Sequence, residues 1–309
     1  MASIESPYTL QNLRHWTPDP EGRPVRFGVV GDPVAHSASP PMHNAALRAC
    51  GIEMQYVRIH LRPPELEEGF GLLLQNGFAG VNFTIPHKTA VIPFLDSIDP
   101  NAERLGAVNT VRFENGRSRG YNTDGPGLVK AVLASFGAKL GDMRAMIVGV
   151  GGGAGRAAAI QCAIEGCGEI SLVNRTLSKA ETLAHFLRGL TTGKPASSIR
   201  VIEDSPEVLS NALAQTDIVL QGSSLGMAEG DASPLPKQAI EKHHLIYDTI
   251  YSRRTQLIED AHSKGARCAN GLSMLLHQGA LSFEIWLHRP APVEVMNHAL
   301  LAATGFSRI

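Results

Sequence analysis

Five short apolar runs in the second half of the chain follow one another at regular spacing, with helix-like stretches between most of them. Parallel strands need long crossover connections, which are usually helices, so this alternation predicts a parallel sheet. A glycine-rich turn after the first run is typical of the first strand of a dinucleotide-binding series. We therefore expect a doubly wound Rossmann domain over residues 124–270. The runs cover residues 145–149, 169–174, 198–203, 217–222 and 245–250.

The first half of the chain repeats the alternation of strands and helices. Strand-like runs at 26–30, 54–61 and 79–85 flank helix-like stretches at 40–50 and 64–77. This order again predicts parallel strands that are joined by crossover helices. The fold class is therefore α/β, with a second domain beside the Rossmann domain.

Two further segments set the expected domain boundaries. Asn115 and Gly116 lie between two β runs, which predicts a hairpin before the Rossmann series begins. Residues 271–287 carry an apolar stripe at helical spacing and come after the second series of strands. We expect this helix to return to the first domain, which then consists of residues 25–123 plus 271–309. A ligand is expected in the cleft between the two α/β domains.

The N-terminal residues and the composition exclude several classes of protein. Residues 1–24 contain two Pro-rich turns and lack the basic start and apolar core of a secretion signal, so we expect a loosely held N-terminal arm. The net charge is −1 and there is no basic run, which argues against nucleic acid and membrane partners. No stretch approaches the roughly 18 apolar residues of a membrane span. The four cysteines have no CxxC spacing and are expected to be free thiols of a cytoplasmic protein.

The glycine turn is expected to hold the phosphates of a dinucleotide. Gly149 permits a tight turn, Gly151 lets the backbone approach a pyrophosphate, and Gly153 or Ala154 lets the following helix pack close to the strand. The N-terminus of that helix presents free N–H groups to the phosphates. Plain tight packing would produce a similar pattern, and the sequence alone leaves that alternative open.

The end of the second Rossmann strand favours NADP over NAD. An NAD site usually has an acid here to bind the ribose 2′-hydroxyl. This chain has Asn174, Arg175 and Thr176 instead, with Lys179 one turn later. A guanidinium and a hydroxyl suit a 2′-phosphate, which an acid would repel. The alternative is a solvated helix start with Thr176 as its cap.

Two segments far apart in the chain, 81–88 and 121–125, concentrate amides, hydroxyls and one charged group each after strand-like runs. The charged groups are Lys88 and Asp124. A lysine ammonium can stabilise the negative charge that develops on a ketone oxygen during hydride transfer and can supply the proton. Together with the dinucleotide turn, this pair indicates a carbonyl reductase that acts on a polar small molecule. The alternative is a surface lysine and an aspartate that caps the next helix.

The loop after the first strand adds two hydroxyls. Ser37 and Ser39 precede the first helix and can bind a carboxylate at its N-terminus, although Ser39 could equally serve as the helix cap. His36, His43 and His87 lie in three different contexts without the spacing of metal ligands, so we expect no metal site.

Jointly, these motifs resemble the shikimate dehydrogenase family. The stretches GDPVAHSASPPMHN, NFTIPHK, GAVNT, NTDG, GVGGG, NRT and GLSMLLHQ follow one another in the order and spacing of that family, from about Arg26 to the C-terminus. The resemblance implies NADP-dependent reduction of 3-dehydroshikimate to shikimate, a step of aromatic amino-acid biosynthesis, on two α/β domains around a cleft. The expected partner is therefore a small-molecule substrate, and the chain is expected to be a monomer or a homodimer.

The resemblance also assigns roles to single residues. Lys88 and Asp124 match the catalytic pair, and Ser37 and Ser39 match the residues that hold the substrate carboxylate. The partners of the ring hydroxyls and the reacting oxygen include Thr84, Asn109 and Gln278, with Tyr251 on the substrate side. The residues that match the cofactor site are Gly149, Gly151, Gly152, Gly153, Asn174, Arg175, Thr176 and Lys179, with Met227, Gly271 and Met274 near the nicotinamide.

Three departures from the family pattern concern the cofactor half. Gln221 to Met227 replaces the usual Asn-(Ala/Cys)-Thr before the Gly-Met turn. The segment from Tyr251 to Thr255 is one residue shorter than the usual Tyr-x-Pro-x-x-Thr and lacks its proline. An extra residue near Gly153 leaves the match of Arg156 open.

The nearest rival interpretation is a quinate/shikimate or aminoshikimate dehydrogenase on the same scaffold, with relaxed substrate or NAD use. Ser39 in place of threonine, and Asn-Arg-Thr in place of an acid, favour shikimate with NADP. A rival of another class is a non-catalytic paralogue that binds ligand, in which loss of Lys88 or Asp124 would be expected; both are present.

Overall fold

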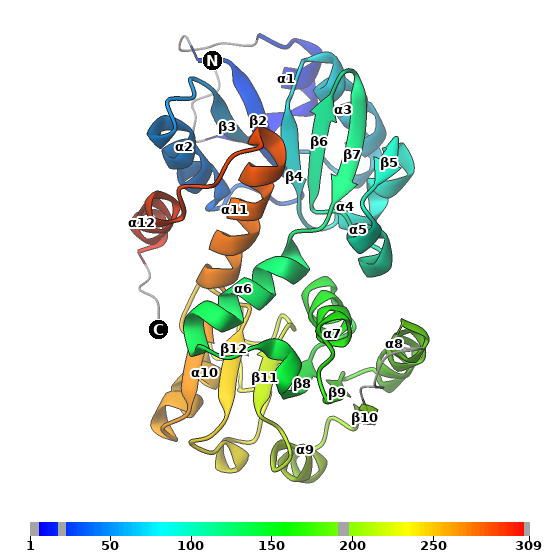
Figure 1. Cartoon of the computed structure of the whole chain (residues 1–309), viewed down its shortest axis with the longest axis vertical. Coiled ribbons are helices and arrows are strands. Elements are labelled where there is room, and N and C mark those ends of the chain that lie inside the picture. The colour runs from blue at the N-terminus through cyan, green and yellow to red at the C-terminus, as the bar shows by residue number, and fades with distance from the viewer. Residues whose placement is uncertain (1–5, 18–22, 191–197, 306–309) are drawn as a thin grey trace. The chain divides into compact units, whose positions relative to one another are not determined.

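The computed structural model describes residues 6–17, 23–190 and 198–305 of the chain. The chain divides into two compact units (Figure 1). The first unit contains the residues up to Asp124 together with Leu276–Gly305, and the second contains Gly125–Leu275. The predicted α/β class is confirmed, since strands and helices alternate through both units.

The first unit is built on a sheet with the strand order β1-β3-β2-β4-β6-β7-β5. The strands β1, β3, β2 and β4 are parallel, whereas β6 is antiparallel to both β4 and β7. The predicted hairpin is present, because β6 and β7 meet at Asn115 and Gly116, both with positive φ. The strands are β1 Tyr8–Thr9, β2 Val25–Gly31, β3 Gln55–His60, β4 Gly80–Phe83, β5 Ser97–Ile98, β6 Thr110–Glu114 and β7 Arg117–Tyr121.

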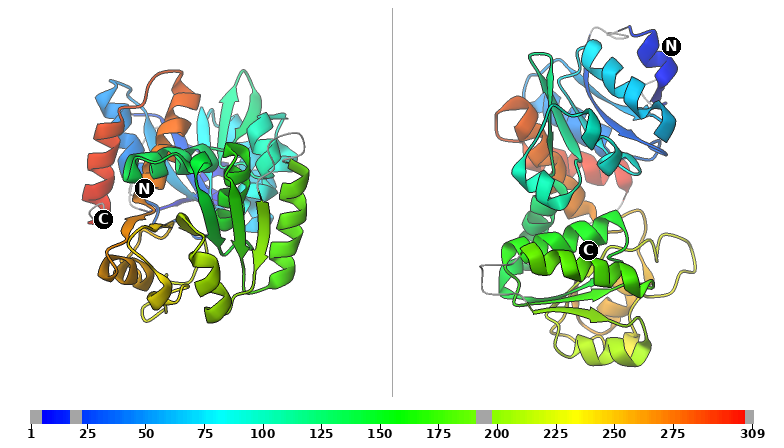
Figure 2. Two further views of the ribbon diagram at one scale, coloured as in Figure 1. Left: turned by 60° about the horizontal axis from the view of Figure 1, so that its bottom comes forward. Right: turned by 90° about the vertical axis from the view of Figure 1, so that its right-hand side faces the viewer.

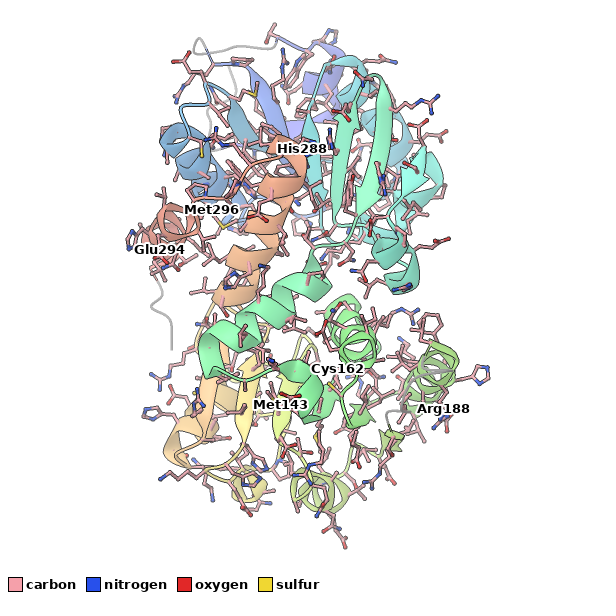
Figure 3. All side chains as sticks on the ribbon, viewed as in Figure 1. Met143, Cys162, Arg188, His288, Glu294 and Met296 are labelled. Atoms are coloured by element: carbon pink, nitrogen blue, oxygen red, sulfur yellow. The ribbon has the colours of Figure 1, made fainter. Side chains whose placement is uncertain are left out.

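The helices of the first unit include two that come from the C-terminal end of the chain. The helix α12 packs against α2, and its Met296 and Leu300 are fully buried (Figure 3). The helix α11 contributes its residues from Leu276 onward. The helices are α1 Leu10–Arg14, α2 Ser39–Ala49, α3 Leu66–Gln75, α4 His87–Ala90, α5 Pro100–Leu105, α11 Leu272–Leu287 and α12 Val293–Thr304, with 3₁₀ turns η1 Pro63–Glu65 and η2 Ile92–Phe94.

The indole of Trp286 fixes α11 against the first sheet. Its Nε1 donates to the carbonyl of Val111 in β6 at 2.9 Å. Gly80 of β4 leaves room for the ring, because a Cβ at this position would overlap the indole. The predicted apolar stripe of α11 therefore packs directly on the strands that carry the polar motifs.

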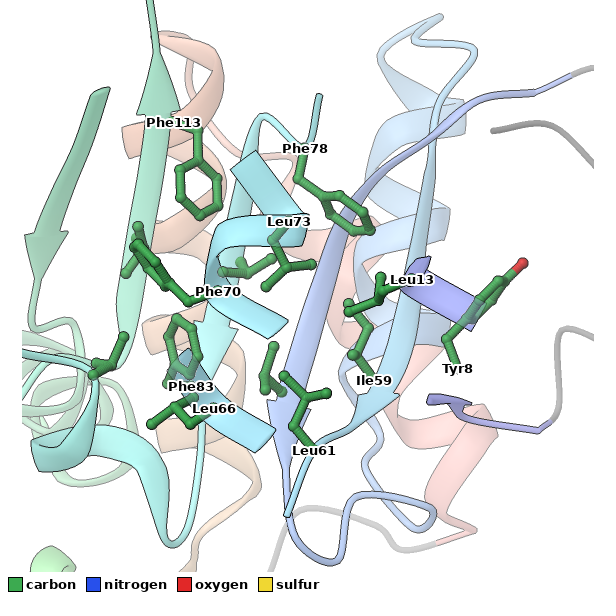
Figure 4. Close-up of a cluster of buried hydrophobic side chains, with 14 of the residues drawn as sticks. Tyr8, Leu13, Ile59, Leu61, Leu66, Phe70, Leu73, Phe78, Phe83 and Phe113 are labelled. Atoms are coloured by element: carbon green, nitrogen blue, oxygen red, sulfur yellow. The ribbon is translucent and has the colours of Figure 1, made fainter. Parts of the chain in front are cut away.

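The start of the chain is not the loosely held arm that the sequence suggested, as far as the described residues 6–17 show. Tyr8 and Thr9 pair with Ile59 and His60 as a parallel edge strand. Tyr8, Leu10 and Leu13 are buried in the hydrophobic cluster of this unit (Figure 4). The helix α1 has only five residues, which is too short for an apolar periodicity that predicts a helix from sequence. The predicted Pro-rich turn near residues 18–20 lies outside the described residues.

The second unit is a six-stranded parallel sheet with the order β10-β9-β8-β11-β12-β13 and with helices on both faces (Figure 2). The five predicted strands are all present, and a sixth, β13, extends the edge. The strands are β8 Arg144–Val148, β9 Glu169–Val173, β10 Ser198–Ile202, β11 Ile218–Gln221, β12 Leu245–Asp248 and β13 Arg267–Asn270. The helices are α6 Asp124–Phe136, α7 Gly153–Glu165, α8 Leu177–Leu190, α9 Pro206–Leu213 and α10 Gln256–Ser263, with 3₁₀ turns η3 Leu140–Asp142 and η4 Lys237–Ala239.

All four cysteines are free thiols, as predicted. Cys162 of α7 and Cys167 are buried, whereas Cys50 and Cys268 are partly exposed (Figure 3). The neighbouring Cys167 thiol and burial raise the pKa of Cys162 well above its ordinary value, so its thiol stays protonated at neutral pH. Within the described ranges, no helix combines the length and apolarity that a membrane crossing requires.

Candidate functional site

The polar motifs of the first unit follow the carboxyl ends of β2 and β4, where parallel strands bring their loops together. The loop after β2 and the loop after β4 are joined by backbone hydrogen bonds. The amide of Asp32 donates to the carbonyl of Ile85 at 3.0 Å, and the amide of Thr84 donates to Val30 at 2.9 Å. The chain therefore places Thr84 beside the end of β2, one residue beyond β4 and half-buried.

Lys88 and Asp124 form an ion pair within the first unit. Lys88 lies in the short helix α4, directly after the β4 loop, and Asp124 is the first residue of α6. The Lys88 Nζ donates to Asp124 Oδ2 at 2.6 Å. The side chains are 31% and 13% exposed, so the pair is partly dry and yet accessible from solvent.

The carboxamide of Asn109 holds the other oxygen of Asp124. Its Nδ2 donates to Asp124 Oδ1 at 3.0 Å and lies 3.3 Å from the Gln278 Oε1 of α11. Its Oδ1 accepts the Thr123 amide at 2.8 Å. Asn109 is 2% exposed. Four residues that the sequence analysis singled out, from four separate segments, are thus linked by hydrogen bonds.

Further hydroxyl and amide side chains, which the sequence analysis did not single out, form hydrogen bonds to Asn109. The Asn82 Nδ2 donates to the carbonyl of Asn109 at 3.1 Å and to Ser282 Oγ at 3.0 Å. The Thr110 hydroxyl donates to Asn109 Oδ1 at 3.0 Å and contacts Ser282 Oγ at 2.8 Å. All of these side chains are buried. Asn82 and Thr110 lie inside the quoted motifs, which was the available signal for them.

The loop that carries Ser37 and Ser39 is held from β3. Arg58 donates from Nε and Nη2 to the carbonyl of Ser37, at 3.1 and 2.7 Å. The amide of Ser39 donates to Ser37 Oγ at 3.3 Å. Ser39 does not cap α2, because the helix begins at Ser39 itself and the position before it, Ala38, makes no side-chain cap. The capping alternative for Ser39 is therefore wrong. Burial raises the pKa of Tyr56 well above its ordinary value, and the neighbouring Ser39 hydroxyl acts in the opposite direction.

The glycine turn of the second unit differs from the prediction at one position. Gly149 has a positive φ of 82°, as a tight turn requires. The close approach of helix and strand, however, is made by Gly155, where a Cβ would overlap the carbonyl oxygen of Gly149. Gly153 has open space around its Cα, so its predicted packing role is wrong. Gly152 is the N-cap of α7. The close-packed Gly155 lies one residue later than the third glycine of a G-x-G-x-x-G turn that starts at Gly149.

Asn174 links the glycine turn to the Asn-Arg-Thr segment. Its Oδ1 accepts the amide of Gly151 at 2.9 Å and its Nδ2 donates to the carbonyl of Thr176 at 2.9 Å. A Cβ at Gly151 would meet the side chains of Asn174 and Lys179, both at 2.9 Å. Arg175, Thr176 and Lys179 are exposed beside the turn. The cations and the glycine cradle therefore fit a dinucleotide with a phosphate on its ribose.

Arg156 takes no part in this cluster. Its guanidinium lies over the ring of Phe186 in α8, 5.1 Å from the ring centroid. The sequence left open whether Arg156 matches a cofactor residue of the family. In the structure its guanidinium packs on α8.

The unusual Gln221 organises the loop that follows β11. Its fully buried carboxamide accepts the amide of Ser223 at 3.0 Å and donates to the carbonyl of Leu225 at 2.8 Å. The longer glutamine side chain thereby closes a compact turn. Met227, which follows this turn, is 59% exposed.

Asp231 closes the second half of the same loop. Its carboxylate accepts the amides of Gly226 and Ala228 at 2.8 and 3.0 Å. These hydrogen bonds lower the pKa of Asp231, so the carboxylate is charged at neutral pH. In the sequence, Met227 lies between Gly226 and Ala228, whose amides Asp231 binds.

The loop after β12 carries Tyr251 and depends on the buried Asp248. The Asp248 carboxylate accepts the Thr255 hydroxyl at 2.6 Å and the amide of Ile250 at 3.0 Å. Thr255 in turn caps α10 by accepting the amide of Ile258. Burial raises the pKa of Asp248 to about 6 and also raises the pKa of Tyr251. The shortened segment is thus held without the proline of the family pattern.

Gly271 and Met274 lie at the start of α11, in the second unit. The backbone of Gly271 approaches Thr249 so closely that a Cβ would overlap the Thr249 carbonyl oxygen. The amide of Met274 donates to the Tyr247 hydroxyl at 3.0 Å. Both residues therefore occupy the same edge of the sheet as the loop of Tyr251, after the ends of β12 and β13.

The histidines of the first unit have packing partners. His43 is buried and stacks on Tyr56, with ring centroids 4.4 Å apart, and burial lowers its pKa to about 3. The His87 Nε2 donates to the carbonyl of Leu61 at 2.7 Å. Among residues 6–17, 23–190 and 198–305, no group of three or more His, Cys, Asp or Glu side chains is arranged to hold a metal ion.

The structure thus gathers the sequence-predicted residues in two sets. The first unit contains Ser37, Ser39, Thr84, Lys88, Asn109, Asp124 and Gln278. The second unit contains Gly149, Gly151, Gly152, Gly153, Asn174, Arg175, Thr176, Lys179, Met227, Tyr251, Gly271 and Met274.

Comparison with known proteins gives consistent matches. The family model described as "Shikimate dehydrogenase substrate binding domain" matches residues 29–111, and the model "Shikimate 5'-dehydrogenase C-terminal domain" matches residues 271–301. The chain is 41% identical to the shikimate dehydrogenase (NADP(+)) of Moorella thermoacetica, over 90% of this chain and 93% of that protein.

Solved structures agree with the sequence matches. A shikimate dehydrogenase in complex with NADP+ superposes with a TM-score of 0.84 at 33% identity and covers 93% of this chain and 99% of its own. The Thermus thermophilus enzyme in complex with NADP(H) and shikimate gives a TM-score of 0.78 at 34% identity, with 90% and 99% coverage.

Proposed function

The chain belongs to the shikimate dehydrogenase family, and we propose that it is an NADP-dependent shikimate dehydrogenase, which reversibly reduces 3-dehydroshikimate to shikimate. This reaction is a step of aromatic amino-acid biosynthesis. The observation that carries the proposal is the cluster in which Lys88 and Asn109 bind Asp124 and Gln278 contacts Asn109. It joins a partly dry acid–base pair to several hydrogen-bonding groups for a polyhydroxylated ring.

Lys88 and Asp124 are the proposed catalytic pair. NADPH, when bound, supplies the hydride. As negative charge develops on the substrate oxygen, the Lys88 ammonium stabilises it and delivers a proton to it. Asp124 holds Lys88 by the 2.6 Å ion pair and keeps an oxygen available to a substrate hydroxyl. In shikimate oxidation, the same lysine takes the proton back.

The remaining residues of the first unit bind the substrate in this proposal. Ser37 and Ser39 hold its carboxylate, and Thr84, Asn109 and Gln278 contact its hydroxyls. We also assign Tyr251, from the second unit, to substrate binding.

The second unit is proposed to bind NADP. The pyrophosphate is held by the amides of Gly149, Gly151, Gly152 and Gly153 at the N-terminus of α7. Asn174 shapes the turn, and Arg175, Thr176 and Lys179 bind the 2′-phosphate. Met227, Gly271 and Met274 lie on the nicotinamide side. The support is the glycine cradle, in which a side chain at Gly151 would collide with Asn174 and Lys179.

We further propose that the first unit is the substrate domain and the second unit the NADP domain. The expected bounds, 25–123 plus 271–309 and 124–270, differ from the two units by a few residues at the junctions and leave out β1 and α1. The enzyme is proposed to work in the cytoplasm, as a monomer or a homodimer. Four free thiols suit a reducing compartment.

The decisive experiment is a spectrophotometric assay that follows nicotinamide reduction with shikimate or quinate, each with NADP and with NAD. We expect kcat/KM to be highest for shikimate with NADP. Comparable kcat/KM with NAD would reject the assigned role of Arg175, Thr176 and Lys179. A preference for quinate would instead place the chain with the quinate dehydrogenases.

A further inference from the structure

Strand β3 places an arginine without an acidic partner beside the serine loop, which we define as residues 37–39. Arg58 uses its Nε and Nη2 to bind the carbonyl of Ser37. Within the described part of the chain, no carboxylate pairs with it. Arg58 is partly buried, and this burial lowers its pKa. A partly buried cation that the chain leaves uncompensated is suited to an anionic ligand.

Tyr56 lies two residues earlier on the same strand, and therefore on the same face of it. It is fully buried, and its ring is held by the stacked imidazole of His43. Its hydroxyl donates to Asn82 Oδ1 at 2.7 Å. The Ser39 hydroxyl lies nearby: burial raises the pKa of Tyr56, and Ser39 acts in the opposite direction.

These two residues of β3 act on the two serines separately. Arg58 fixes the backbone of Ser37, whose Oγ accepts the amide of Ser39. Tyr56 lies next to the side chain of Ser39. The backbone of Ser37 is therefore held by β3, and the Ser39 hydroxyl lies beside the same strand and does not cap α2.

We propose that Tyr56 and Arg58 are positioning residues that make the serine loop selective for a carboxylate on the substrate. The inference rests on the proposed function and deepens it by naming the source of the selectivity for an anionic ring. Two serine hydroxyls are neutral donors that also suit an alcohol or a carbonyl. The guanidinium behind them adds the positive charge that distinguishes a carboxylate from these groups.

Tyr56 has a second connection that Arg58 lacks. Asn82, which accepts the Tyr56 hydroxyl, also donates to the carbonyl of Asn109, and Asn109 binds Asp124. A series of hydrogen bonds thus links Tyr56 to the acid–base pair. Arg58 therefore affects binding alone, whereas Tyr56 affects binding and turnover.

The first test replaces Arg58 in the full-length enzyme. Loss of a charged hydrogen-bonding group predicts that Arg58→Gln raises KM for shikimate about tenfold, with kcat within about twofold of the unaltered enzyme and KM for NADP unchanged. Arg58→Lys keeps the charge and recovers part of the loss. KM for shikimate should rise with ionic strength in the unaltered enzyme, and less steeply in Arg58→Gln.

The second test is a double-mutant cycle between Tyr56→Phe and Ser39→Ala. Tyr56→Phe keeps the ring and its stack on His43 but removes the hydroxyl. We expect KM for shikimate to rise about fivefold, kcat to fall about threefold, and the KM effect to disappear in the Ser39→Ala background, since the two groups act as a unit.

The control is Ser118→Ala, in the same unit and remote from the site. Ser118 also has a buried hydroxyl with two hydrogen bonds, both to Asp96. It should lower the melting temperature without changing KM for shikimate.

Two results would overturn the inference while the proposed function stands. One is an unchanged KM for shikimate in an active Arg58→Gln enzyme, or in Arg58→Lys if the glutamine variant does not fold. The other is full additivity in the cycle. If the unaltered chain does not oxidise shikimate with NADP, the proposed function fails, and the inference fails with it.

Discussion

Lys88 and Asp124 meet because each lies just beyond a strand of the first sheet. Lys88 follows β4 and Asp124 follows β7, and β6 pairs with both of these strands. Asn109, at the start of β6, therefore lies between them and binds Asp124. The ion pair is therefore a consequence of the strand order. Because neither residue lies within a strand, the Lys88 side chain can be removed without altering the sheet.

At this scale we predict that Lys88→Ala reduces kcat by at least roughly 10²-fold, the range for loss of an acid–base or oxyanion group. Substrate binding should be largely retained, because the serine loop and Gln278 are untouched. Steady-state kinetics measure the loss, and Lys130→Ala, an exposed lysine of α6, is the matched control. Near-normal turnover in Lys88→Ala would refute its catalytic role.

The buried Asp248 gives a pH prediction. Its folded pKa of about 6 lies above the ordinary value of 3.8, so between these values the folded state binds the extra proton. The free energy of unfolding should therefore fall as pH rises from 4 to 6, and this residue's contribution should then level off.

We expect Asp248→Asn to have a flatter pH dependence of the free energy of unfolding between pH 4 and 7 than the unaltered chain. Urea denaturation followed by circular dichroism measures it. Parallel curves for the two proteins would show that Asp248 does not titrate in this range.

At the residue scale, the sequence identifies the charged groups of a site better than the buried amides and hydroxyls that hold them in place. Lys88 and Asp124 stand out because each is the one charged group in a short segment of amides and hydroxyls that follows a strand-like run. Asn82 and Ser282 do not, because amides and hydroxyls are common, and their 3.0 Å contact joins residues 200 positions apart. No spacing rule predicts such a pair.

At the scale of elements, the first turn of α7 is tightly packed against the glycine turn. We predict that Gly155→Ala weakens NADP binding at least about tenfold, because its Cβ would overlap the Gly149 carbonyl oxygen and backbone cannot move aside cheaply. Fluorescence titration with NADPH measures the affinity.

Gly168→Ala is the control for that variant, since nothing lies within 4 Å of a Cβ at Gly168. It should bind NADPH normally. Normal affinity in Gly155→Ala would mean that α7 is free to shift away from the turn.

The elements that the sequence predicted are the long, apolar ones. Four of the five predicted strands of the second unit, β8, β9, β11 and β12, have nearly continuous buried positions, which is typical of a parallel sheet. The edge strand β10 is predicted although two of its five residues are exposed. The missed strand β13 has an exposed Arg267 and a partly exposed Cys268, and the missed β1 has two residues. Short edge strands of this kind bury too little for their sequence to reveal them.

At the scale of the whole chain, the first unit is assembled from two distant segments. Phe283, Trp286, Met296 and Leu300 are buried in it, although they follow the entire second unit in sequence. We predict that a chain cut after Leu275 still binds NADP and no longer binds shikimate, because removal of these side chains exposes the core of the first unit.

Titration of the shortened chain with each ligand tests this prediction, and limited proteolysis shows which unit is digested. The full-length chain is the reference. Protection of the first unit in the shortened chain would show that its core does not depend on α11 and α12.

The split of the first unit between the two ends of the chain has a consequence during synthesis. A ribosome releases Gly125–Leu275 as one uninterrupted stretch, which can fold as soon as it emerges. The N-terminal part of the first unit is synthesised well before α11. The strand β4 and its neighbours therefore stay uncovered by Trp286 until translation is almost finished. The first unit therefore begins synthesis first and becomes compact last. We expect a chaperone to bind this unit during synthesis.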